Sequence, residues 1–197
     1  MDYSIVWDHL YLVILAVIFS IIVGLPLGIL AYFKEPIRKI ILWSVEILQT
    51  IPTLALLGII MVVLGAGKTT VIAGLVLYSL LPIVHNTFVG LDNIDRGIKE
   101  AAKGMGMTQM DRLLSVEIPL AFPMIFTGIR IATVTSIGAA VFATSVGGGG
   151  LGSIINKGIR TQNMDLILFG TLALMIMAIF FDTAMSKMGD QLAAKRT

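Results

Sequence analysis

Long apolar runs constrain this chain more than any other feature of its sequence. A helix that crosses the ~30 Å hydrocarbon core of a bilayer needs roughly 20 mostly apolar residues. Five stretches meet this requirement: 10–33, 40–64, 71–91, 120–146 and 164–185. None of them has the ten-residue alternation of an outer-membrane strand. The sequence therefore predicts an all-α transmembrane fold, a five-span helical bundle in which residues 1–197 form a single transmembrane domain.

The composition excludes several other classes of protein. The chain is 57% hydrophobic and only 13% charged, whereas soluble domains are about 25% charged. It has no cysteine, so disulfides, cysteine-ligated zinc and thiol nucleophiles are excluded. Its two histidines rule out most histidine-based metal sites, and its net charge of +2 is too small to suggest nucleic acid as a partner.

The positions of the basic residues predict how the chain is oriented. With five spans and the N-terminus outside, ten of the fourteen Lys and Arg residues lie inside: Lys34, Arg38, Lys39, Arg96, Lys99, Lys103, Arg112, Lys187, Lys195 and Arg196. Three lie outside, namely Lys68, Lys157 and Arg160. The positive-inside rule then favours N-terminus out and C-terminus in. An odd number of spans also does not divide into the inverted repeats typical of secondary transporters.

The inner segment 92–119 between spans three and four reads as a helix, a turn and a second helix. Its first part has one apolar stripe at helical spacing, formed by Ile94, Ile98, Ala101, Ala102 and Met105. We expect Gly104 and Gly106 to end this helix, because glycine leaves a helix at low cost.

A second short helix is expected to follow. Thr108 is a candidate N-cap with Asp111 as its acidic partner, and Pro119 is expected to stop this helix before span four. The residues alone leave two readings open, a functional element or a loop lying on the bilayer surface.

A resemblance to a known family favours the first reading. Glu100-Ala101-Ala102 is followed after three residues by Gly106 and after twelve more by Pro119. This pattern resembles the EAA loop of permease subunits of ABC importers. The resemblance implies the type I importer permease fold, with the loop acting as a coupling helix that docks into a groove of a cytoplasmic ATPase.

Three further segments look like permeases for osmoprotectants, which import glycine betaine, carnitine and choline. They are 49–56, 81–87 and 147–152. His85 departs from this branch, because many relatives carry Arg there. The resemblance implies a multi-pass protein of the cell (cytoplasmic) membrane, paired with a second permease, identical or paralogous, on an ATPase dimer. It also implies an extracytoplasmic substrate-binding protein, ATP-Mg held only by the ATPase, and no cofactor or catalytic residue in this chain.

Polar residues cluster in two consecutive spans. They are Gln49, Thr50, Pro52 and Thr53 in span two, and Pro82, His85 and Asn86 in span three. Proline frees a backbone carbonyl that nearby polar groups can satisfy. The two clusters predict either a shared polar seam that forms part of the translocation path, or ordinary hydrogen bonding between helices.

The glycine run after span four comprises Gly147, Gly148, Gly149, Gly150 and Gly152. It fits a dinucleotide fingerprint only by accident, because no strand precedes it. We interpret it as a flexible segment that shapes the outer end of the path, with a plain extracellular turn as the alternative. The Gly67-Lys68-Thr69 triplet likewise lacks the first glycine of a phosphate-binding loop, since Val62 stands there.

The charged residues within the spans, and the absence of two catalytic motifs, bear on rival functions. Glu46 and Asp182 are expected at the membrane interface, near the inner ends of their spans, whereas Arg130 lies deeper and should pair with a carboxylate or with backbone carbonyls. An autonomous secondary transporter or channel, using Glu46 or His85 as a coupling group, remains the alternative. An intramembrane enzyme is disfavoured, because the chain has neither G-x-S-x-G nor H-E-x-x-H.

Overall fold

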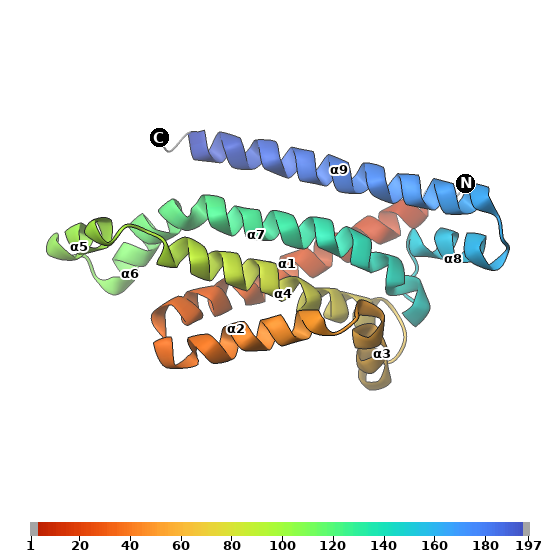
Figure 1. Ribbon diagram of the computed structural model, residues 1–197, viewed down its shortest axis with the longest axis horizontal. Coiled ribbons are helices and arrows are strands. Elements are labelled where there is room, and N and C mark those ends of the chain that lie inside the picture. The colour runs from red at the N-terminus through yellow and green to blue at the C-terminus, as the bar shows by residue number, and fades with distance from the viewer. Residues whose placement is uncertain (1–3, 195–197) are drawn as a thin grey trace.

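The computed structural model describes residues 4–194, and all regular structure in that range is helical (Figure 1). Its α-helices are α1 Ser4–Phe33, α2 Glu35–Thr50, α3 Thr53–Leu64, α4 Lys68–Asp92, α5 Arg96–Gly104, α6 Gln109–Arg112, α7 Ile118–Ala139, α8 Gly152–Arg160 and α9 Met164–Ala194. A π-helical turn, Leu113–Glu117, joins α6 to α7, and a 3₁₀ helix, Ala140–Val146, continues α7.

Four continuous helical segments are long and apolar enough to cross a membrane: Ser4–Phe33, Lys68–Asp92, Gln109–Val146 and Met164–Leu192. The expected span 40–64 is not one of them, because it is broken into α2 and α3, which meet at 102°. Pro52 causes the break. Ile51, the residue before it, is extended with ψ 126°, as steric conflict with a following proline ring favours. Residues 4–194 therefore contain four candidate spans, or five if the bent pair crosses as one.

The expectation that Pro119 stops the second loop helix is wrong. The chain stays helical from Gln109 to Val146, and Pro119 occupies the first turn of α7. A proline is tolerated in the first turn of a helix, because the backbone N–H that it lacks would have no hydrogen-bond partner within that helix. The π turn before it makes this possible, since the Ile118 N–H bonds back to the Leu113 carbonyl, five residues earlier.

The bundle is centred on α4, which packs against both α1 and α7, while α9 packs against α7 on the other side (Figure 1). Small residues bring α1 close to α4. A Cβ atom at Gly28 would lie 2.6 Å from the Thr87 Cβ and 2.9 Å from the Val84 carbonyl oxygen. Such close approach strengthens helix association where lipid supplies no hydrophobic driving force. The largest buried cluster lies between these helices and includes Leu12, Leu75 and Ile137.

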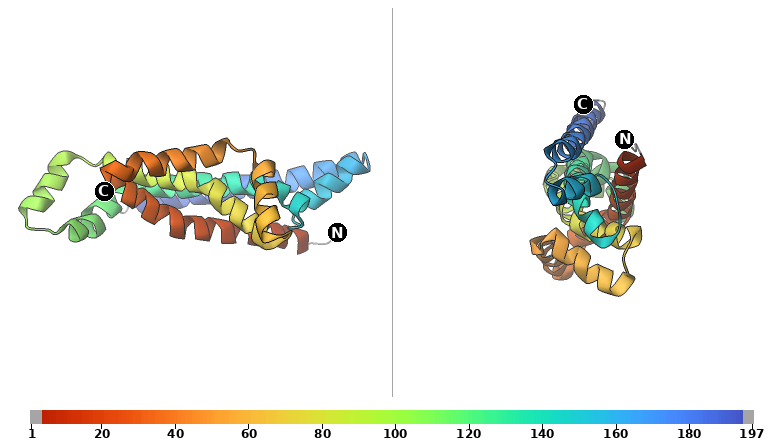
Figure 2. Two further views of the ribbon diagram at one scale, coloured as in Figure 1. Left: turned by 90° about the horizontal axis from the view of Figure 1, so that it is seen from below. Right: turned by 90° about the vertical axis from the view of Figure 1, so that its right-hand side faces the viewer.

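The two ends of the elongated bundle differ. At the α5 end, α5 and α6 project beyond the long helices, whereas α3, α8 and the start of α1 lie at the opposite, α8 end (Figures 1 and 2). The expected inside set of basic residues lies at the α5 end, apart from Lys195 and Arg196, which fall outside the described residues. The three expected outside, Lys68, Lys157 and Arg160, lie at the α8 end. The structure thus separates the two charge sets along the bundle axis.

Candidate functional site

The first candidate site is the projecting helix α5, which begins at an N-cap that the sequence reasoning missed. The Asp95 Oδ1 accepts hydrogen bonds from the backbone N–H groups of Gly97 at 2.7 Å and Ile98 at 3.3 Å. Aspartate is among the preferred N-cap residues because it satisfies N–H groups that have no partner in the first turn. The signal was therefore present in the sequence, between Ile94 and Ile98 of the apolar stripe.

The Glu100-Ala101-Ala102 triplet divides between the surface and the interior. Glu100 and Ala101 are exposed, whereas Ala102 is buried. The helix ends as expected, at Gly104, and Gly106 then turns the chain with φ +82°, a left-handed conformation that favours glycine. The turn is closed by a hydrogen bond from the Gly106 N–H to the Lys103 carbonyl at 3.0 Å.

The expected capping box at the next helix is confirmed. The Thr108 hydroxyl accepts from the Asp111 N–H at 3.2 Å, and the Thr108 N–H donates to the Asp111 carboxylate at 3.3 Å. Thr108 and Asp111 therefore fix where the chain re-enters a helix after the α5 turn. The fifth residue of the expected loop motif, Pro119, lies apart from this turn, within α7.

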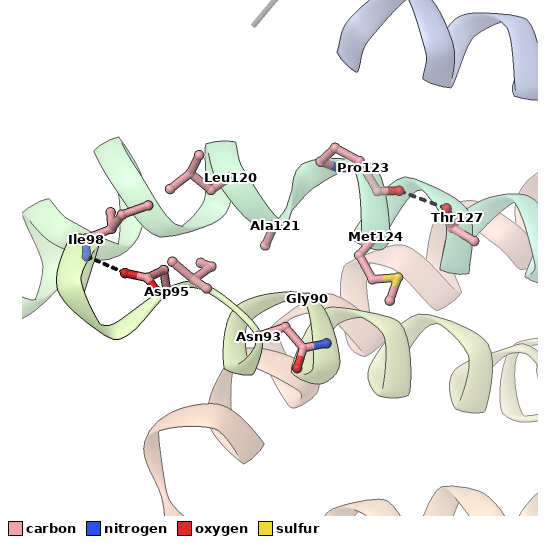
Figure 3. Close-up of a pocket in the computed structure, with 10 residues that line it drawn as sticks. Gly90, Asn93, Asp95, Ile98, Leu120, Ala121, Pro123, Met124 and Thr127 are labelled. Carbon is pink, nitrogen blue, oxygen red and sulfur yellow. Dashed lines mark hydrogen bonds between the residues drawn. The ribbon is translucent and has the colours of Figure 1, made fainter. Parts of the chain in front are cut away.

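A groove of about 440 Å³ lies between the base of α5 and the helices α4 and α7 (Figure 3). Its lining includes Asn93 and Asp95 from the α4–α5 connection, Ile98 from α5, and Met124 and Thr127 from α7. The groove separates α5 from the body of the bundle on this side. The base of α5 is therefore open to solvent on the side that faces α4 and α7.

A second groove, of about 370 Å³, brings together residues from both polar clusters. Gln49 from α2 meets Pro82, His85 and Asn86 from α4, and the lining is completed by Glu46, Leu81 and Ile131. The Asn86 amide donates to the Pro82 carbonyl, one turn earlier in the same helix, at 2.7 Å. Half of the predicted seam is thus assembled around His85.

The other members of the α2 cluster lie away from this groove. The Thr50 hydroxyl bonds to the Ile47 carbonyl of its own helix at 2.7 Å. Pro52 forms the bend, and Thr53 begins α3 beyond it. Glu46 lies further along its helix than expected, because α2 starts at Glu35 and not at residue 40. The bend at Pro52, which hydrophobic periodicity does not predict, therefore determines which polar residues lie close together.

The glycine run forms a tight turn at the α8 end, packed against neighbouring helices. Gly147, Gly149 and Gly150 have φ of +78°, +77° and +82°. A side chain at Gly148 would collide with Val71, and one at Gly152 with the Val141 carbonyl. Glycine is required here for conformation at three positions and for space at the other two.

This turn is also anchored from two sides. The Gly67 N–H donates to the Val146 carbonyl at 2.8 Å, which joins the α3–α4 turn to the start of the run. His9 of α1 is fully buried beneath Gly150, and its Nε2 lies 3.0 Å from the Ile137 carbonyl oxygen. Four separate parts of the chain therefore meet at the α8 end of the bundle.

The expectation that Arg130 pairs with a carboxylate is confirmed, and its partner is Asp182. The guanidinium of Arg130 in α7 makes two hydrogen bonds to the Asp182 carboxylate in α9, from Nε at 2.6 Å and from Nη2 at 2.8 Å. Such bidentate pairing fixes the relative orientation of the two side chains. Asp182 therefore joins two helices. Within residues 4–194, no group of three or more His, Asp or Glu side chains could hold a metal ion.

Comparison with known proteins gives a consistent result. Residues 16–196 match the family described as "Binding-protein-dependent transport system inner membrane component". The carnitine transport permease protein OpuCB of Listeria monocytogenes is 38% identical over 96% of this chain and 87% of its own length. The osmoprotectant import permease protein OsmW of Salmonella typhimurium is 39% identical over 98% of this chain and 92% of its own.

A third relative and two solved structures extend this similarity. The glycine betaine/carnitine/choline permease OpuCD of Bacillus subtilis is 42% identical over 91% of this chain and 79% of its own. The inward-facing MetNI methionine ABC transporter matches with a TM-score of 0.86 and 25% identity over 95% of this chain and 94% of its own. An amino acid ABC transporter matches in fold, with a TM-score of 0.81 and 19% identity over 95% and 92%.

Proposed function

The chain belongs to the family of binding-protein-dependent transport system inner membrane components, and we propose that it is the transmembrane permease subunit of an ATP-driven ABC importer for osmoprotectant quaternary amines. One observation gives this proposal its main support. The similarity to osmoprotectant permeases runs through nearly the whole chain, including the helical segment between α4 and α7 that bears the Glu100-Ala101-Ala102 triplet. Glycine betaine, carnitine and choline are the solutes named for the relatives.

The topology proposed for this permease has five spans in one transmembrane domain, with the bent α2–α3 pair crossing as span two. The N-terminus is then outside and the C-terminus inside. The separation of basic residues between the α5 end and the α8 end supports this orientation. The α5 end faces the cytoplasm, where an ATPase can reach the projecting helix.

In this proposal α5 is the coupling helix. Glu100 and Ala101 lie on its exposed surface and are available to a partner, whereas Ala102 is buried beneath them. Gly106 holds the turn that follows, and Pro119 helps define the first turn of α7. The ATPase dimer binds ATP-Mg and hydrolyses it, so this subunit contributes no catalytic residue and no cofactor.

The translocation path is proposed to follow the groove around His85, which combines Glu46 and Gln49 of α2 with Asn86 of α4. Intramembrane polar and charged groups usually face a bundle interior or a water-filled cavity, which supports this assignment. The glycine turn at residues 147–152 would shape the outer end of the path. A second permease, identical or paralogous, completes the path from the other side, and an extracytoplasmic binding protein delivers the solute.

Purification from native membranes in mild detergent tests the proposal. We expect a stoichiometric cytoplasmic ATPase to purify with the tagged chain, and Glu100→Lys to abolish this association by reversing the charge on the exposed face of α5. Glu35→Lys is the matched control, because Glu35 is exposed at the same end but lies outside the loop. A chain that purifies alone from fresh membranes in several detergents, and that transports without ATP, would support an autonomous transporter instead.

A further inference from the structure

A buried carboxylate at the α5 end has no role in the function proposed above. Glu117 closes the π turn that leads into α7, and its side chain is fully buried. Its Oε1 accepts a hydrogen bond from the Arg112 Nε at 2.5 Å, while its Oε2 has no hydrogen-bond partner. A buried carboxylate is strongly disfavoured unless it is paired and fully hydrogen-bonded. The site is therefore unusual, because one of the two oxygens is buried without a partner.

Two residues from other elements complete what we call the Glu117 cluster, which consists of Tyr32, Lys99, Arg112 and Glu117. The phenol of Tyr32, in the last turn of α1, lies next to the Glu117 carboxylate. The Lys99 ammonium of α5 lies over the Tyr32 ring, 5.0 Å from its centroid. This is the geometry of a cation–π interaction. The cluster thus connects α1, α5 and the start of α7.

Lys99 also connects the coupling helix to α4. Its Nζ donates to the carbonyl oxygens of Leu91 at 2.9 Å and Asp92 at 3.3 Å, at the end of that helix. Carbonyls in a last helical turn have no partner within the helix, so a lysine bound there is held both by hydrogen bonds and by the helix dipole. Lys99 is therefore the side chain through which α5 contacts both α4 and α1.

Stability alone does not account for the Glu117 cluster. A buried ion pair often stabilises a fold less than apolar residues of similar volume, because both charges lose their hydration. The Glu117 carboxylate lies beside two donors, the Arg112 guanidinium and the Tyr32 hydroxyl, and it has a free Oε2, so its oxygens can exchange partners between them. Energetic coupling between distant sites needs an element with two such discrete arrangements.

We propose that the Glu117 cluster is the linkage that transmits displacement of α5 to the membrane-spanning helices, with Lys99, Tyr32, Arg112 and Glu117 acting as positioning residues. The inference rests on the proposed function, because it requires a motor that moves α5. When the motor displaces α5, Lys99 moves relative to the Tyr32 ring and to the end of α4. The Glu117 carboxylate then exchanges partners, and the start of α7 follows.

The test measures glycine betaine taken up per ATP hydrolysed by the complete complex, purified and reconstituted into liposomes. Lys99→Met keeps the apolar stem but removes the charge, and Glu117→Gln removes the buried charge. We expect each to retain the ATPase and its hydrolysis while lowering uptake per ATP by about tenfold or more, the effect of losing a charge-assisted hydrogen bond. Lys187→Met, an exposed lysine at the same end in α9, is the matched control and should leave the ratio unchanged.

Substitutions of Tyr32 separate the two contacts of its side chain. Tyr32→Phe keeps the ring under Lys99 and removes only the hydroxyl beside Glu117, whereas Tyr32→Leu removes both. We expect Tyr32→Leu to lower the ratio as far as Lys99→Met does. The double variant should be no worse than either single one, because both remove the same contact. Tyr32→Phe should lower the ratio less.

Three results would decide against these ideas in different ways. An unchanged uptake per ATP in Lys99→Met and Tyr32→Leu refutes the linkage, even if Glu117→Gln fails to fold. A parallel loss of uptake, ATP hydrolysis, complex yield and melting temperature in these variants shows that the cluster is structural only and also refutes it. Absence of ATP-dependent uptake of glycine betaine, carnitine and choline by the wild-type complex refutes the proposed function itself.

Discussion

Replacing Gly128 by alanine tests the packing that places α7 against the polar groove. Gly128 is buried in α7, and a Cβ atom there would lie 2.5 Å from the Pro82 carbonyl oxygen and 2.8 Å from the Asn86 Cβ. Carbon atoms normally approach to about 3.5–4.0 Å. Alanine at this position would therefore force α4 and α7 apart locally. It would also disturb the Pro82 carbonyl that holds the Asn86 amide.

The magnitude follows from two opposing effects. Glycine in a helix interior costs about 1 kcal/mol relative to alanine, so the substitution gains that much from helix propensity. Overpacking in a close-packed interior costs about 1–3 kcal/mol. Gly138→Ala is the matched control, because Gly138 lies in the same helix and a Cβ atom there would have no neighbouring atom within 4 Å. The difference in unfolding free energy between the two variants should be about 1–3 kcal/mol, since the propensity gain is common to both.

The assay is unfolding of the purified protein in mild detergent, followed by thermal melting and by titration with a denaturing detergent. Gly128→Ala should melt below Gly138→Ala, and Gly138→Ala should melt at or above the wild type. Uptake should fall only in Gly128→Ala, because only this variant displaces residues of the groove. Equal stability of the two variants would refute the close approach of α4 and α7 at this point.

Three further substitutions test other parts of the structure. Gly106→Ala should weaken ATPase binding, because a left-handed alanine costs about 1–2 kcal/mol; Gly104→Ala, in the last turn of α5, should not, and pull-down titration measures both. Gly149→Val should impair uptake while the ATPase still co-purifies, since its φ of +77° disfavours a branched side chain; normal uptake would remove the glycine turn from the path. Asp182→Asn should expose α9 to faster hydrogen exchange by leaving Arg130 without its carboxylate partner, and an unchanged exchange rate would show that the pair does not hold α9.

Local chemistry accounts for the parts of the fold that the sequence predicts well. An apolar run long enough to cross a bilayer can be seen in the sequence alone, so the approximate limits of four candidate spans are visible without tertiary information. The α5–α6 turn is equally local: Gly106 supplies a left-handed residue, and Thr108 with Asp111 supplies a capping box. In these cases each residue interacts with its own segment. Neighbouring helices are not needed to choose the conformation.

Prolines show where this local reasoning ends. Pro26, Pro82 and Pro123 lie inside continuous helices, whereas Pro52 breaks its helix by 102°. All four lack the same N–H group, so composition does not distinguish them. The outcome depends on what surrounds each one. Pro82, for example, is buried in α4 with Gly128 of α7 packed against its carbonyl oxygen, and the helix continues.

Long-range pairs are the other part that the sequence could not supply. Arg130 and Asp182 are 52 residues apart, and the sequence around either residue does not indicate which residue it pairs with. Glu117 was overlooked for a related reason. When Pro119 is taken as the end of a helix, the residues before it read as a surface segment, whereas the observed π turn directs Glu117 into the interior beside Arg112.

The apolar stripe of α5 connects the fold to its proposed partner. In an amphipathic helix such a stripe is expected to pack on its own protein, but only Ala102 does so fully, whereas Ile98 is 42% exposed and Met105 is 75% exposed. The helix also projects beyond the ends of the spanning helices (Figure 2), so the hydrocarbon core cannot cover these side chains. Ala102 is buried, whereas the larger Ile98 and Met105 keep much of their side-chain surface exposed. An exposed apolar surface next to Glu100, on a projecting helix, has the features expected of a docking site for a protein that moves it.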